Sequence, residues 1–311
     1  MTDTSLEFCL VDAFALSPCT GNVAGVILNA DDLSDRQMQL IAREFNAPET
    51  TFILSPTMKD AAVRFRWFSP GCEVSFCGHA TLAGVHALLE SGRYARELTE
   101  PGTVLPIETR AGILSVRTEA SPDAAKPPTI WLDMPHCQPK SRNVILPPLL
   151  DRVGLSMGQL DPRLPAIRTQ DDDVILAVKD LQALLTLAPA MSDLARYCKG
   201  EQMRGVLVTT TNVLSPTSLV QSRFFAPAVG IDEDPVTGSA HGPLGLHLVE
   251  CGIVPLSNGC ADFYCAQGNA SRAGMVRVVV THSSAGVKEV RIGGSCVTTA
   301  AGTWKSLPAS N

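Results

Sequence analysis

The fold is decided by residues 79–89, HATLAGVHALL, a stretch without aspartate, glutamate, lysine or arginine. We expect a helix here, and a helix that is apolar on every side is a buried one. Residues 239–249, SAHGPLGLHLV, have the same character. Their helix is expected to start near Ser239, because a proline such as Pro243 is tolerated only near the first turn. The chain therefore contains two helices that each need a surrounding layer.

The segments before the two helices are also alike. Residues 66–70, RWFSP, match residues 223–227, RFFAP, at an offset of 157, and residues 78–80, GHA, match residues 238–240, GSA, at an offset of 160. Each copy contains a strand, Phe-x-Pro, an acidic loop, a glycine turn and a buried helix. Two unrelated sheet-to-helix turns are the alternative, but the shared order favours a structural duplication.

Short strand patterns bounded by turn residues make up most of the remainder. They cover residues 8–11, 25–28, 51–54, 63–68, 114–116, 129–132, 174–178, 205–209, 276–280 and 289–292. Further helices are expected at residues 33–45, with Ser34 as the N-cap, and at 181–187 and 191–198. The sequence therefore predicts an α+β protein with two pseudo-symmetric halves. Each half is expected to be a curved, mostly antiparallel β-roll or barrel around a central apolar helix.

The turn-rich residues 120–128, ASPDAAKPP, are the best candidate boundary between the halves. We expect an N-terminal half at residues 1–124 and a C-terminal half at 125–311. The last strand, near residues 288–297, could return to the first half. The pseudo-symmetry would bring both helix N-termini to a shared cleft, where the active site is expected.

Composition limits the classes of function. The 311 residues are 45% hydrophobic and 18% charged, with a net charge of −6, which argues against nucleic acid or an anionic membrane as a partner. No apolar run approaches the roughly 18 residues of a membrane span, and residues 1–5 lack the positive charge of a signal peptide. We therefore expect a cytoplasmic protein. Its ten cysteines contain no C-x-x-C pair, so neither disulfides nor a metal site is expected.

Three sites could carry chemistry. His79 follows Gly78 at a helix start, where free amides attract an anion and the imidazole could act as an acid or base; a simple capping histidine is the alternative. Asp234 precedes a proline, which holds it extended, and Ser239 follows Gly238 at the second helix start; a solvated acidic loop with an N-cap serine is the alternative.

The third site is Glu49, which lies between an amphipathic helix and an apolar strand. Burial there would make the carboxylate more basic and suit it to general acid–base catalysis, whereas an exposed loop residue is the alternative. The sequence has no P-loop, G-x-G-x-x-G after a strand, G-x-S-x-G or H-E-x-x-H motif. Nucleotide use, hydride transfer, serine hydrolysis and zinc proteolysis are thereby disfavoured.

Taken together, the motifs resemble the PhzF family of phenazine biosynthesis-like isomerases, which share the diaminopimelate epimerase fold. The matching stretches are residues 12–14, 21–22, 49–52, 67–70, 77–83, 225–227, 233–240 and 267–268. They follow the family order over most of the chain. Two departures are Pro48, where the family often has serine, and residues 271–274, which only loosely match the usual Gly-Arg-Pro turn.

The resemblance implies a cofactor-independent isomerase that shifts a proton between carbons of a small carboxylate-bearing metabolite, commonly as a homodimer. Glu49 matches the general acid and base, and His79 and Asp234 match polar residues that hold the substrate and can move a proton. The implied site residues are Glu49, His79 and Asp234 as catalytic groups, and Gly78, Gly238, Ser239, Ala80 and Asn22 as substrate-binding groups. No cofactor is implied.

Two alternatives remain open. A racemase of the two-thiol kind needs a cysteine on each side of the substrate, and Cys77 stands where the first would be. Thr237 occupies the second position and cannot act as the acid–base partner, so Cys77 is interpreted as a packing residue. The other alternative is a non-catalytic binding protein that keeps the fold.

Overall fold

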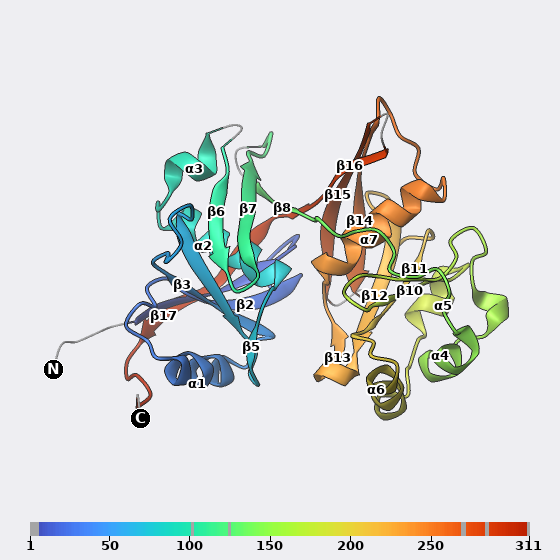
Figure 1. Ribbon diagram of the computed structural model, residues 1–311, viewed down its shortest axis with the longest axis horizontal. Helices are drawn as coiled ribbons and strands as arrows, with labels where there is room; N and C mark the ends of the chain where they lie inside the picture. Colours follow the sequence, from blue (N-terminus) through green and yellow to red (C-terminus); the bar gives the residue numbers. More distant parts are fainter. Residues whose placement is uncertain (1–5, 101–102, 124–125, 269–271, 284–285, 310–311) are drawn as a thin grey trace. The chain divides into compact units, whose positions relative to one another are not determined.

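The computed structural model describes residues 6–100, 103–123, 126–268, 272–283 and 286–309 (Figure 1). The chain divides into two compact units, Met1–Asp133 with Gly293–Asn311, and Met134–Ile292. The boundary expected at residues 124 and 125 lies outside the described residues. None of the described helices is both long enough and apolar enough to cross a membrane.

The described residues of the first unit form a sheet and three helices. Its elements are β1 (Leu6–Ala13), β2 (Asn22–Ile27), α1 (Asp35–Phe45), β3 (Glu49–Leu54), β4 (Val63–Phe68), β5 (Glu73–Val74), α2 (Gly78–Glu90), α3 (Ala95–Thr99), β6 (Leu105–Thr109), β7 (Gly112–Glu119), β8 (Thr129–Asp133) and β17 (Cys296–Trp304). The strands pair in the order β17, β1, β2, β3, β4, β6, β7 and β8, and β5 also pairs with β4. Only β2/β3 and β4/β6 are parallel among these pairs.

Helix α2 is the buried helix that residues 79–89 predict. It packs on β1, β2, β3, β8 and β17 of its own unit, and every residue from Gly78 to Leu88 is buried. Gly84 allows the helix to approach the sheet closely, because a Cβ at this position would lie 2.7 Å from the ring of Phe65. The expected central apolar helix is confirmed.

Helix α1 starts and ends as its sequence indicates. Ser34 is its N-cap and forms a capping box with Gln37. The helix ends at Asn46, which adopts the left-handed conformation with φ of 51°. Met38 and Ile41 lie on its buried face, so α1 covers the sheet with one side only.

The second unit repeats this plan. Its elements are α4 (Leu146–Val153), η1 (Met157–Gln159), β9 (Ile167–Arg168), β10 (Val174–Ala177), α5 (Leu181–Leu185), α6 (Met191–Gly200), β11 (Val206–Thr210), β12 (Val220–Ala226), η2 (Pro227–Val229), β13 (Ile231–Asp234), α7 (Gly238–Glu250), β14 (Cys260–Gly268), β15 (Ala273–Ser283) and β16 (Gly286–Gly294). Four successive strand pairs define its sheet: β10/β11 is parallel, β11/β12 antiparallel, β12/β14 parallel and β14/β15 antiparallel. The pairs β2/β3, β3/β4, β4/β6 and β6/β7 of the first unit follow the same order of directions. The duplication is therefore confirmed at the level of topology.

The α+β class is therefore confirmed, with three differences in detail. The described strands form open sheets and do not close into a barrel. The acidic segment 231–234 is not a loop but strand β13, because it pairs with β12. Helix α7 starts at Gly238, one residue before the expected Ser239, and Pro243 lies in its second turn, where it removes the hydrogen bond to the carbonyl of Ser239.

Candidate active site

Glu49 is the first residue of β3, where it pairs in parallel with Ala24 of β2. The left-handed Asn46 ends α1 and turns the chain into this strand. The Glu49 side chain is 13% exposed, so it is not the exposed loop residue that was the alternative. The strand start thus holds a largely buried carboxylate in place.

His79 faces Glu49 from the first turn of α2. Its Nε2 lies 3.3 Å from Oε2 of Glu49, and its side chain is 9% exposed. Burial lowers the pKa of His79 to about 4. The imidazole is therefore neutral at neutral pH and carries one N–H.

The other ring nitrogen decides which tautomer is present. Nδ1 lies 3.4 Å from Nδ2 of Asn22 and 3.5 Å from Sγ of Cys77. With the Asn22 amide in this orientation, its N–H donates to Nδ1, which places the imidazole proton on Nε2. Nε2 lies 3.3 Å from Oε2 of Glu49 but makes no hydrogen bond among the described residues, so the imidazole can act on a bound ligand beside the carboxylate.

Two hydroxyl groups fix the turn that carries His79. The hydroxyl of Thr51, two residues after Glu49, donates to the carbonyl of Ala80 at 2.7 Å. This bond connects the strand that carries Glu49 to the first turn of α2. The hydroxyl of Thr81 donates to the carbonyl of the N-cap residue Cys77 at 2.6 Å and so holds the start of the helix itself.

The first turn of α2 is suited to bind an anion. The N-cap residue Cys77 makes no capping hydrogen bond through its side chain, and the turn contains no acidic residue. The turn amides and the positive end of the helix dipole therefore favour a negatively charged ligand. A Cβ at Gly78 would touch only Leu132, at 3.8 Å, so the glycine leaves space beside these amides. Ala80 lies on the same turn.

In the second unit Asp234 belongs to a hydrogen-bond network. The carboxylate, on a residue 9% exposed, accepts a hydrogen bond from the hydroxyl of Thr237 at 2.5 Å. The buried amide of Gln267 donates to the carbonyl of Asp234 at 2.7 Å and accepts from the backbone N–H of Thr237 at 3.0 Å. Gln267 belongs to the matching stretch at residues 267–268, and its contacts give it a positioning role.

Arg204 is a residue that the sequence did not single out. It donates to the hydroxyl of Ser239 at 3.0 Å, beside Gly238 in the first turn of α7. It also forms a forked ion pair with Asp173, which is 1% exposed. Burial raises the pKa of Asp173, although Arg204 opposes this shift. A single arginine before a glycine forms no recognisable motif, and its role appears only from its contacts with Asp173 and Ser239 in the fold.

Register shows that the two units are not chemically equivalent. Thr50 pairs with Phe68, and Val206 pairs with Phe225, the residue that matches Phe68 in the repeat. Glu49, one residue before Thr50, therefore corresponds to Gly205. The second unit has no carboxylate at the position of Glu49.

The structure thus gathers the candidate residues in two groups. The first unit contains Asn22, Glu49, Gly78, His79 and Ala80, and the second unit contains Asp234, Gly238 and Ser239. In the first group, Glu49, Cys77 and His79 each offer one donor atom within 4.8 Å of the others, an arrangement that could hold a metal ion. The sequence predicted no metal site, because these donors are far apart in the chain or lack a recognised spacing.

Known proteins resemble this chain over nearly its whole length. The family model of the phenazine biosynthesis-like proteins, PhzC-PhzF, matches residues 11–302. An uncharacterized isomerase of Clostridium acetobutylicum is 36% identical over 296 residues, which cover 92% of this chain and 94% of the relative. The crystal structure of a PhzF-family phenazine biosynthesis protein from Bacillus anthracis has a TM-score of 0.84 at 28% identity, covering 97% of this chain and 99% of that one. A probable proline racemase of Agrobacterium radiobacter shares the fold, with a TM-score of 0.63 at 12% identity over 96% of this chain and 92% of that chain.

Proposed function

Since the chain belongs to the PhzC-PhzF family of phenazine biosynthesis-like proteins and is an isomerase, we propose that it shifts a proton between carbons of a small carboxylate-bearing metabolite. Glu49 takes the proton from a C–H bond that is acidified by a neighbouring group and returns it to another carbon of the same molecule. No cofactor takes part in this proposal.

The observation that carries the proposal is the contact between Glu49 and His79. A carboxylate that is 13% exposed lies 3.3 Å from a neutral imidazole at the start of a buried helix. Partial burial strengthens a carboxylate as a base, and the imidazole N–H can stabilise negative charge that develops on the substrate. The amides at the start of α2 suit the substrate carboxylate.

Groups of the second unit are proposed as substrate-binding residues. Asp234 is fixed by Thr237 and Gln267, and Ser239 accepts a hydrogen bond from Arg204 at the start of α7. Fixed polar groups bind a substrate at a lower entropic cost than mobile ones. We propose that Asp234 and Ser239, with the backbone of Gly238, orient the substrate.

One observation favours a thiol-based epimerase as a second candidate. Cys77, interpreted from the sequence as a packing residue, has its Sγ 3.5 Å from Nδ1 of His79, so an imidazole lies beside the thiol. The equivalent position of the second unit is Thr237, whose hydroxyl donates to Asp234. With one thiol, the two-thiol mechanism lacks its second acid–base group.

Solvent deuterium incorporation tests the proposal. Three proteins are incubated in D₂O with amino, hydroxy and dihydroaromatic acids: the wild type, Glu49→Gln and a control, Glu44→Gln. Glu44 lies on the exposed side of α1. We expect a C–H signal to disappear with the wild type and Glu44→Gln but not with Glu49→Gln. Exchange by Glu49→Gln at the wild-type rate would remove Glu49 from the role of base. A fall of several orders of magnitude for Cys77→Ala would favour the thiol mechanism.

We further propose a cytoplasmic homodimer. The ten cysteines are thiols and not disulfides, as is usual in a reducing compartment. Sedimentation equilibrium would then give a mass near twice the 33.0 kDa of the chain.

A further inference from the structure

Three different kinds of metal-binding donor meet at the start of α2. Cys77 Sγ lies 3.5 Å from Nδ1 of His79, and Nε2 of His79 lies 3.3 Å from Oε2 of Glu49. One donor atom from each residue lies within 4.8 Å of the other two, and no other such group of three occurs in the described parts of the chain. We propose that Glu49, Cys77 and His79 bind one Zn²⁺ ion and that the bound ion inhibits the isomerase.

The donor set favours zinc over other common divalent ions. Thiolate sulfur, imidazole nitrogen and carboxylate oxygen are the three protein ligands that Zn²⁺ accepts, whereas Mg²⁺ and Ca²⁺ prefer oxygen alone. Donors of a tetrahedral zinc site are roughly 3.5 Å apart. One ion binds only one nitrogen of the imidazole. Nδ1 is already 3.5 Å from the Cys77 sulfur, and Nε2 is 3.3 Å from the Glu49 carboxylate. Whichever nitrogen binds, the longest separation in the group, which is within 4.8 Å, must shorten by roughly 1 Å.

The charges also balance. A Cys77 thiolate and a Glu49 carboxylate together supply two negative charges, which neutralise the ion. The positive end of the α2 dipole opposes a cation only weakly, a small cost beside two anionic ligands. Three protein ligands leave the fourth zinc position open to water or to a carboxylate.

Inhibition, unlike binding, rests on the proposed function. Zinc occupies the lone pair of Glu49 that would remove the substrate proton, so the base is blocked while the ion is bound. Chelation of the ion restores the free carboxylate. The site would therefore make the activity sensitive to free zinc.

Metal binding is measured first, without any substrate. Chelator-treated full-length protein is titrated with Co²⁺, and a thiolate-to-cobalt charge-transfer band in the near ultraviolet reports sulfur ligation. Zn²⁺ is then titrated in competition with a chromophoric chelator. We expect one zinc per chain, displacement of cobalt by zinc, and an affinity that falls on the order of 100-fold or more in Glu49→Gln, Cys77→Ala and His79→Gln.

A second Cys–His pair provides the matched control. Cys251 Sγ lies 3.6 Å from Nδ1 of His247 in α7, so Cys251→Ala removes a thiol with the same kind of imidazole contact. We expect this variant to bind zinc as the wild type does. Far-ultraviolet circular dichroism checks that each variant is folded. The cobalt spectrum of the wild-type protein tests sulfur ligation even if a variant fails to fold.

Three results would overturn the binding proposal: no stoichiometric zinc, a cobalt complex without the thiolate band, or zinc affinity unchanged by Glu49→Gln and His79→Gln. Inhibition is then tested with any acid that exchanges deuterium, where zinc is expected to slow exchange and a chelator to restore it. Normal exchange in saturating zinc would overturn the inhibitory role alone. A protein that binds zinc at this site but exchanges no acid would contradict the proposed function and leave the zinc site standing.

Discussion

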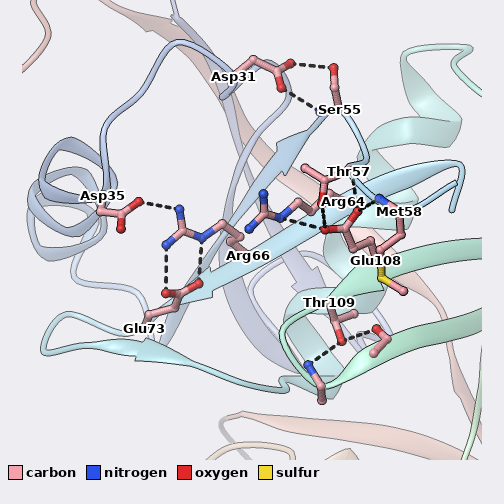
Figure 2. A network of polar contacts seen from close by, with 12 residues as sticks. Asp31, Asp35, Ser55, Thr57, Met58, Arg64, Arg66, Glu73, Glu108 and Thr109 are labelled. Carbon is pink, nitrogen blue, oxygen red and sulfur yellow. Dashed lines mark hydrogen bonds and ion pairs between the residues drawn. The ribbon is translucent and has the colours of Figure 1, made fainter.

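Arg66 and Arg223, which are 157 residues apart in the chain, make the same contact in the two units. Arg66 forms a forked ion pair with Glu73, and Arg223 forms one with Glu233 (Figure 2 shows the first pair). Each guanidinium also stacks on the phenylalanine two residues later, at 5.1 and 4.9 Å from the ring centre. The duplication thus extends from topology to individual side chains, and Glu233 is an ion-pair partner of Arg223.

The Arg66 pair is expected to stabilise the first unit. Arg66 is 13% exposed and Glu73 is 20% exposed, so Arg66→Ala leaves a poorly solvated carboxylate and removes the stacking on Phe68. We expect the free energy of unfolding to fall by about 2–3 kcal/mol, measured by urea denaturation. The control is Arg96→Ala, which breaks an ion pair between the 80% exposed Arg96 and the 53% exposed Glu100 and is expected to cost about 0.5 kcal/mol or less. Equal losses for both variants would contradict this prediction.

Gln267 is expected to matter for both stability and activity. Gln267→Leu leaves the buried carbonyl of Asp234 and the N–H of Thr237 without the partner that they have now. We expect a loss of about 2–4 kcal/mol in unfolding free energy and at least about tenfold slower deuterium exchange, because Asp234 is no longer held in place. The exposed Gln170 gives the control Gln170→Leu, which is expected to change stability by about 0.5 kcal/mol or less. Wild-type exchange by Gln267→Leu would show that the network does not serve the site.

The sequence predicted what depends on local pattern. Apolar composition identified α2 and α7, and alternation or turn residues identified β4 and β10, because these signals lie within one element. The contact between Arg204 and Ser239 joins residues that are 35 positions apart. The contact between Glu49 and His79 crosses from a strand to a helix. Such contacts are set by strand register and helix packing, which a single sequence encodes only through the whole fold.

Arg204 is expected to support substrate binding through Ser239. Arg204→Met alone leaves Asp173 buried without its ion-pair partner, which we expect to cost about 3–5 kcal/mol of stability. The double variant Arg204→Met/Asp173→Leu removes both charges and is expected to recover most of that loss. In this double variant, the dissociation constant of the exchanging acid is expected to rise by roughly 10- to 100-fold, with a smaller change in the exchange rate at saturation. Binding at wild-type affinity would show that Arg204 serves the fold alone.

His241 predicts an acid-sensitive stability. It is fully buried, its Nδ1 bonds to the carbonyl of Thr237 at 2.9 Å, and burial lowers its pKa to about 4 from an ordinary value of 6.5. Between these two values the unfolded chain binds a proton that the folded chain does not, so stability falls as the pH falls. This group contributes a slope of up to about 1.4 kcal/mol per pH unit. Urea unfolding at pH 7, 6 and 5 should show a shallower slope for His241→Gln than for the wild type.

The exposed His136 gives the control for this pH series. His136→Gln is expected to retain the wild-type slope, and His79, whose pKa burial also lowers to about 4, contributes in the same direction in both variants. If His241→Gln retained the full slope, the buried imidazole at this position would not be the source of the acid sensitivity.

Thr51 allows the positioning of His79 against Glu49 to be tested without altering either residue. Its hydroxyl donates to the carbonyl of Ala80 at 2.7 Å, and Thr51→Val keeps the shape of the side chain but removes the donor. The buried carbonyl then lacks this bond, at a cost of about 1–3 kcal/mol. We expect deuterium exchange at saturating substrate to slow by roughly 10- to 100-fold, because a shift of about 1 Å between acid–base groups has effects of this size.

The adjacent Thr50 is the matched control for Thr51. It is also fully buried, but its hydroxyl has no hydrogen-bond partner among the described residues. Thr50→Val therefore removes an unsatisfied polar group and is expected to leave stability unchanged or raise it, with exchange near the wild-type rate. Thr51→Ser restores the donor and should recover most of the exchange rate. If both valine variants slowed exchange equally, the effect would come from packing beneath α2 and not from the hydrogen bond that joins β3 to the His79 turn.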